Sequence, residues 1–334
     1  MRKTKSLLIG LVALAAAVGG VHADDTLVVY SGRSDKFVKP VAQAFTRATG
    51  INVVLHNASS TSLLNKLRVE GARTQADLYL SNDAGNLQMG SSLGLFQALS
   101  PDLVGAIDAQ WRAPDDTWVG LSARARVLVV NTNVANPHIA SVFDLAGSAM
   151  KGRIGITHSS NESFIAGVTV YLLEEGEATT RAWLEGMKAN VEGEVFNKHS
   201  HIVKAVAGGR LDVGLVNHYY IFRHLDQHPG APIRVLLPDQ GEHGMGVAVN
   251  VAGVAISKYS RKKALAEKFV GFLVSEEGQK LFAGLNREYP TRKGVPAAAE
   301  VPPMDSFKVA PVPMYKLAEL RNKTIDLIEA VGMP

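Results

Sequence analysis

The sequence predicts an α/β protein of two lobes, with mixed and mainly parallel sheets and a hinge of two strands. Three observations support this fold class. Short apolar, β-branched runs alternate with amphipathic stretches of helical period, the pattern of strand–helix–strand units. The alternation starts again after residue 150. Two long apolar strands, 126–131 and 246–256, stand where the chain passes between the two units.

The first unit begins with an apolar strand followed by an amphipathic helix. That helix repeats Phe37, Val41 and Phe45 at helical spacing, and Gly50 ends it. Further runs of both kinds complete the unit. We expect strands at 26–30, 51–55 and 76–80, and helices at 36–49 and 61–70.

The second unit repeats this order with shorter strands. We expect strands at 153–157, 195–196 and 213–216, and helices at 164–174, 179–189 and 202–207. A proline-rich stretch, 296–313, then forms an ordered connection to a last helix at 315–331.

The two long strands divide the chain into two discontinuous lobes. The expected N-terminal lobe comprises 24–125 and 250–295, and the expected C-terminal lobe comprises 126–249 and 296–334. Two crossings between lobes make a hinge, and a hinge places a ligand cleft between the lobes.

The first 23 residues have the composition of a secretory signal peptide. Arg2, Lys3 and Lys5 precede an apolar run at 7–18, and small residues end the segment at Ala23, where we expect cleavage. The run is shorter than the roughly 20 residues that a transmembrane helix needs. We therefore expect a periplasmic protein without stable membrane insertion.

Charge and cysteine content exclude several classes of function. The chain has 35 basic and 31 acidic residues, and three of the basic ones lie in the expected signal peptide. A nearly neutral mature protein has no electrostatic reason to bind nucleic acid. The chain has no cysteine, which excludes a thiol nucleophile, a zinc–thiolate site, an iron–sulfur cluster and a lipidated N-terminus. No motif of a hydrolase, metalloprotease or nucleotide-binding enzyme occurs, so we expect a monomeric binding protein and no enzyme.

Two adjacent tyrosines, Tyr219 and Tyr220, follow the apolar strand 213–216. The carboxyl end of a strand is where ligands bind in open α/β sheets. A phenolate oxygen is a hard, charged donor suited to a small trivalent cation, although metal binding must displace a proton of pKa near 10. Spacing alone favours a pair of half-buried aromatics whose hydroxyls bond elsewhere.

A second group of polar residues is suited to an oxyanion. Ser159, Ser160 and Asn161 precede an expected helix, where hydroxyls and free backbone N–H groups can hold carbonate or phosphate. The same residues also fit a plain helix cap. Arg33 and Arg124 are candidates to neutralise the anion.

Several segments carry a resemblance to a known family. They are 27–33, 76–79, 81–85, 122–127, 217–220 and 287–290. In this order and at these distances they resemble the periplasmic ferric-ion-binding proteins of the type II periplasmic binding protein superfamily. The likeness runs over about residues 26–332, and its most specific parts are the tyrosine pair and the segment around Arg124 and Arg126.

The resemblance implies a two-lobed carrier that holds Fe³⁺ in its cleft and passes it to an inner-membrane ABC permease. Tyr219 and Tyr220 would be the main ligands, with a synergistic anion, carbonate or phosphate, completing the coordination. Asn217, next to the pair, would lie on the anion side of the cleft.

The chain departs from the family pattern at three positions. Where many relatives have a histidine after the first strand, this chain has Ser34, with Asp35 beside it. Where some have a glutamate after the third strand, it has Asn82, with Asp83 beside it. A third tyrosine of some relatives corresponds to about Ser163. Asp35, Asp83, water or the anion are therefore the remaining candidate ligands.

Three alternatives remain at this point. The same fold could bind an oxyanion or a small organic solute, or it could carry a hydrolase. The third alternative is a divalent metal held by histidines, because His199 and His201 would share one face of an extended segment and four more histidines follow by residue 243. His199 falls near the position where relatives have an asparagine beside the anion.

Overall fold

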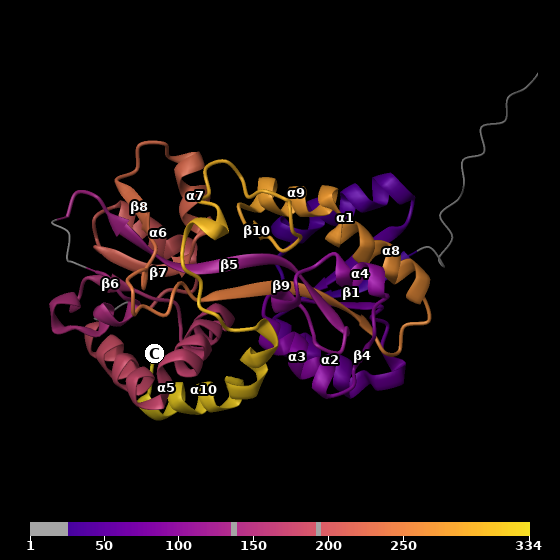
Figure 1. Ribbon diagram of the computed structural model, residues 1–334, viewed down its shortest axis with the longest axis horizontal. Helices are drawn as coiled ribbons and strands as arrows, with labels where there is room; N and C mark the ends of the chain where they lie inside the picture. The colour runs from indigo at the N-terminus through magenta and orange to yellow at the C-terminus, as the bar shows by residue number, and fades with distance from the viewer. Residues whose placement is uncertain (1–25, 135–138, 192–194) are drawn as a thin grey trace, which may run out of the picture.

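Residues 26–134, 139–191 and 195–334 are described by a computed structural model, and they form two lobes joined by paired strands (Figure 1). The expected signal peptide, 1–23, lies outside these residues. Within the described part of the chain, no helix has both the length and the apolar character needed to cross a membrane.

The N-terminal lobe is a sheet with helices on both faces. It contains β1 (Thr26–Ser31), α1 (Asp35–Thr49), β2 (Asn52–Asn57), α2 (Ser60–Glu70), β3 (Leu78–Ser81), α3 (Ala84–Ser92), β4 (Phe96–Gln97) and α4 (Pro101–Gly105), then α8 (Lys263–Val274), α9 (Glu276–Asn286) and β10 (Tyr289–Pro290). In Figure 1, α1, α8 and α9 lie on one side of the sheet and α2 and α3 on the other. Phe45 of α1 packs on Phe269 of α8 with ring centroids 4.8 Å apart, so the apolar face predicted for this helix is buried in the core.

The C-terminal lobe is built in the same way with shorter strands. It contains β6 (Ile154–Gly155), α5 (Glu162–Asn190), α6 (His199–Ala207), β7 (Val213–Asn217), α7 (Tyr219–Gln227), β8 (Ile233–Leu236) and α10 (Leu317–Val331). Trp183 and Tyr171 of α5 are fully buried and fill the centre of this lobe. α10 packs along α5 and also reaches α3 of the other lobe.

β5 (Trp118–Asn131) belongs to both lobes. Its first half, up to Ala125, pairs with β9 (Val249–Ser257), and its second half, from Arg126, pairs with β7 and β8. Arg126 N donates to the carbonyl of Ala248 at 2.8 Å, so the outgoing and returning chain cross at the same place. Figure 1 shows β5 and β9 side by side between the lobes.

The sheets are mixed, with more antiparallel pairing than we expected from the sequence. β1 pairs parallel with β2 and β3, and β6 pairs parallel with β7. The pairings of β5 and β9 are all antiparallel. These two strands connect the lobes and run in opposite directions.

Three local expectations differ from the structure. The strand expected at 195–196 is absent from the described chain, and Phe196 makes only an isolated bridge with Thr157. The two helices expected at 164–174 and 179–189 form the single element α5, in which Gly176 alone has non-helical backbone angles (φ 79°, ψ 174°). The extended segment expected at His199 and His201 is wrong: His199 begins α6, so the two side chains diverge, with His199 buried and His201 exposed.

Candidate functional site

The tyrosine pair lies at the junction of β7 and α7. β7 is buried up to Asn217, and α7 begins at Tyr219, so both phenols leave the first turn of the helix. The two tyrosine rings are in contact, with centroids 4.4 Å apart. Phe37 of α1 meets the Tyr219 ring edge-on at 5.6 Å. The pair therefore faces the N-terminal lobe.

A cavity of about 380 Å³ lies beside both tyrosines and takes its walls from both lobes. The N-terminal lobe contributes the turn Gly32, Arg33 and Ser34, together with Ser59 and Asn82. The C-terminal lobe contributes residues 160–163, His199 and the tyrosine pair. Gly32 is required here, because a Cβ atom at this position would overlap the Ser60 hydroxyl at the start of α2.

Burial beside the cavity favours the protonated phenol of Tyr220. Burial, and then the neighbouring Tyr219, raise the pKa of Tyr220 well above its usual value. The Arg124 guanidinium acts in the opposite direction and lowers it. A cation that binds the phenolate must therefore displace a firmly held proton.

Two buried arginines at the cavity, Arg124 and Arg126, have no acidic partner among the described residues. Arg124 lines the cavity, donates to the carbonyl of Asn82, and has no partner for Nε in this part of the chain. Arg126 donates to Asn217 Oδ1 at 3.3 Å, but its Nε and Nη2 have no partner among the same residues. Burial lowers the pKa of Arg126 to about 10, so it still carries its charge at neutral pH. These two charges exceed the single unpaired carboxylate of the cavity wall, that of Glu162, so the site has a net positive charge suited to an anion.

The turn before α5 supplies further anion donors. Ser160 and Asn161 line the cavity, and Asn161 Oδ1 caps α5 by accepting from Ser163 N at 3.0 Å. The N-terminus of α5 therefore lies at the cavity wall, and the helix dipole favours an anion there.

Four sequence-predicted residues do not have a free side chain in this cavity. Asp83 is buried as the N-cap of α3 and accepts from Arg321 Nη1 at 2.7 Å, so its oxygens are already bonded. Asp35, the first residue of α1, is exposed and lines a different groove, between α1 and β2. Ser159 donates to the carbonyl of Met333, and the Asn217 side chain bonds Arg126 and Ser163.

Arg33 lines the cavity, but its charge is already neutralised. Its Nη2 donates to Glu288 Oε1 at 2.5 Å and its Nη1 to Ser122 Oγ at 2.9 Å, and both Arg33 and Glu288 are buried. This pair leaves Arg124 as the cavity-lining arginine without a carboxylate partner among the described residues.

Comparison with known proteins identifies the family to which the chain belongs. The model of the bacterial extracellular solute-binding proteins matches residues 41–307. The chain belongs to this family. It is 33% identical to iron uptake protein A1 of Synechocystis sp. over 91% of this chain and 86% of that protein. It is 30% identical to the major ferric iron-binding protein of Neisseria meningitidis serogroup B over 96% of both chains.

A solved relative shares the two-lobed architecture of this solute-binding protein. The crystal structure of iron-bound HitA from Pseudomonas aeruginosa superposes with a TM-score of 0.85 at 28% identity, covering 92% of this chain and 99% of that one.

Histidine positions in this solute-binding protein do not fit an all-histidine metal site. The described residues contain no group of three or more His, Cys, Asp or Glu side chains placed to share a metal ion. His218 is buried and uses both ring nitrogens, one on Ala125 N and one on the carbonyl of Arg287.

His199 lines the cavity at the start of α6, whereas we expected it in an extended segment. It is 4% exposed, stacks beside Tyr220 with ring centroids 5.0 Å apart, and neither ring nitrogen has a partner within the described chain. Burial, followed by Arg126 and Arg124, lowers the pKa of His199 well below its usual value. A neutral imidazole therefore stands next to the phenols and the two arginines.

Proposed function

We propose that this protein is the periplasmic solute-binding component of an ABC importer. It captures Fe³⁺ together with a small oxyanion in the interlobe cleft, and as a monomer it delivers the iron to an inner-membrane permease. The observation that carries this proposal is the pair of adjacent phenols, Tyr219 and Tyr220, both lining a cavity shared by two lobes.

A charge argument supports the synergistic anion. Fe³⁺ and two phenolates carry a net charge of +1, and the buried side chains of Arg124 and Arg126 add two further positive charges without a carboxylate partner among the described residues. The Glu162 carboxylate in the cavity wall offsets one of them, which leaves a net charge of +2. Such a concentration of positive charge away from water is strongly unfavourable. A dianion such as carbonate or hydrogen phosphate lowers it, and this explains why the anion and the metal should bind together.

The ligand set follows from which side chains are free. Tyr219 and Tyr220 bind the metal, and the anion and water complete its coordination, since Asp83 is paired with Arg321 and Asp35 lines a different groove. Ser160, Asn161 and Arg124 hold the anion. Ser159, Asn217 and Arg33 support these groups through their own hydrogen bonds.

The names of two relatives support iron as the cargo. The Synechocystis protein is named for iron uptake and the Neisseria protein for ferric iron binding. Both align with this chain over nearly its whole length.

The test is the colour of the metal complex. A phenolate bound to Fe³⁺ gives a visible charge-transfer band, so addition of ferric citrate and bicarbonate should colour the purified protein red to orange. Tyr219→Phe with Tyr220→Phe should abolish the band, whereas Tyr315→Phe, outside the cavity, should leave it unchanged. A double variant that still forms the same band would overturn the proposal.

A further inference from the structure

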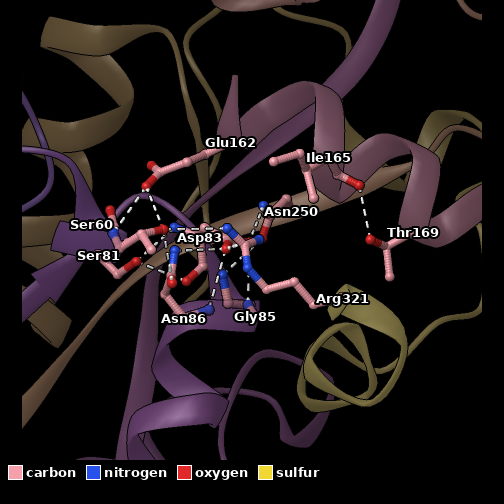
Figure 2. A network of polar contacts seen from close by, with 12 residues as sticks. Ser60, Ser81, Asp83, Gly85, Asn86, Glu162, Ile165, Thr169, Asn250 and Arg321 are labelled. Atoms are coloured by element: carbon pink, nitrogen blue, oxygen red, sulfur yellow. Dashed lines mark hydrogen bonds and ion pairs between the residues drawn. The ribbon is translucent and has the colours of Figure 1, made fainter. Parts of the chain in front are cut away.

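Glu162 makes a contact between the lobes at the edge of the cavity. It is the first residue of α5, between Asn161 and Ser163 of the anion-binding turn. Its Oε1 accepts from Thr61 N at 3.2 Å and lies 3.4 Å from Thr61 Oγ1, in the first turn of α2 of the other lobe. Figure 2 shows Glu162 extending from α5 toward the residues around Ser60 and Asp83.

Through this contact, a carboxylate of the C-terminal lobe accepts a hydrogen bond from a backbone N–H group at the start of α2. Ser59, the N-cap of α2, accepts from Ser62 N with its side chain and from Leu63 N with its carbonyl. Thr61 N has no such partner among the described residues of its own lobe and bonds Glu162 instead. A carboxylate at a helix N-terminus is favoured by the helix dipole as well as by the hydrogen bond. Separation of the lobes would remove both contributions together.

Several charged and polar side chains lie around the contact between Glu162 and Thr61. Burial, and then the Asp83 carboxylate, raise the pKa of Glu162, so its ionised form is less favourable here than in water. Arg321 of α10 bonds Asp83 at 2.7 Å and reaches Thr61 Oγ1 at 3.5 Å. Asn250, at the start of the returning strand β9, bonds Asp83 Oδ1 at 3.1 Å (Figure 2). The contact is thus connected to the strand crossing.

We propose that the Glu162–Thr61 contact, here called the latch, is a positioning device that holds the cleft closed over its cargo. The proposal rests on the proposed function of iron capture. An anion bound at the Asn161–Ser163 turn fixes the start of α5 and with it the Glu162 carboxylate. Occupation of the anion site and closure are thereby coupled, without Glu162 touching the metal.

The experiment measures iron release from the full mature protein loaded with ferric citrate and bicarbonate. Excess EDTA is added, and loss of the phenolate–iron band is followed in time. Glu162→Ala should release iron roughly tenfold faster, the effect expected for one charge-assisted hydrogen bond. Glu162→Gln, which keeps the shape and an acceptor oxygen but loses the charge, should fall between wild type and Glu162→Ala. The position of the band should be the same in all three proteins.

The matched control is Glu329→Ala, which removes an exposed carboxylate from the groove between α2 and α10. Its release rate should equal that of wild type. Unchanged release in Glu162→Ala overturns the latch, and so does a shifted band, which would make Glu162 a metal ligand. If wild type itself forms no band with ferric citrate, the proposed function fails, an outcome distinct from failure of the latch.

Discussion

At the scale of single residues, the proposed function requires Tyr220 to couple iron capture to proton release. Its pKa is raised by burial, so the phenol is protonated in the empty cleft at every physiological pH. Binding therefore releases its proton, and the apparent affinity for Fe³⁺ should fall about tenfold per pH unit for each proton released as the solution is acidified. Calorimetry in two buffers of different ionisation enthalpy counts these protons. Tyr220→Phe should release one proton fewer, and an equal count in both proteins would contradict this role.

His199 provides the second prediction at this scale. Whichever ring nitrogen carries the proton, the imidazole offers one N–H donor, and neither nitrogen is bonded within the described part of the protein. We expect His199→Phe, which keeps the ring packed on Tyr220, to raise the bicarbonate concentration needed for colour by roughly tenfold. His199→Asn should retain most of the dependence, because an amide also donates. Identical bicarbonate titrations of wild type and His199→Phe would show that the anion does not contact this residue.

At the scale of elements, the order of strands and helices is predictable because each buried strand is apolar and each helix has one apolar face. β7 shows this well: its apolar run ends at Asn217, and that pattern by itself places the tyrosine pair at a strand end. The short element β6 and the single break at Gly176 in α5 are less predictable, since tertiary contacts and one glycine decide them.

Side chains with distant partners could not be predicted in the same way. Asp83 follows a strand directly, as a metal ligand would, but Arg321 lies 238 residues away in sequence and occupies its carboxylate. Arg33 is similarly paired with Glu288, 255 residues away. Patterns of neighbouring residues carry no information about such pairs, which is why they locate the tyrosines and misplace the expected acidic partners.

At the scale of the whole molecule, the tyrosine pair is attached to the strand crossing. His218, directly before the pair, accepts from Ala125 N at 3.1 Å with Nδ1 and donates to the carbonyl of Arg287 at 2.8 Å with Nε2. Ala125 is the last residue of β5 that pairs with β9, and Arg287 follows α9. Burial lowers the pKa of His218 to about 4, so this neutral link persists at neutral pH. The tyrosine pair is therefore attached both to the strand crossing and to the end of α9 in the N-terminal lobe.

Closure of the lobes should accordingly depend on the phenols. Under the proposed function, iron bound to Tyr219 and Tyr220 would hold the anion at the turn containing Asn161 and so keep Glu162 in its contact with α2. Small-angle X-ray scattering should show a smaller radius of gyration for wild type after ferric citrate and bicarbonate are added. The double variant Tyr219→Phe with Tyr220→Phe should keep the larger radius under the same conditions. A coloured, iron-loaded wild type whose radius does not change would mean that the lobes are already fixed in place, and the crossing of β5 and β9 would then be a rigid support.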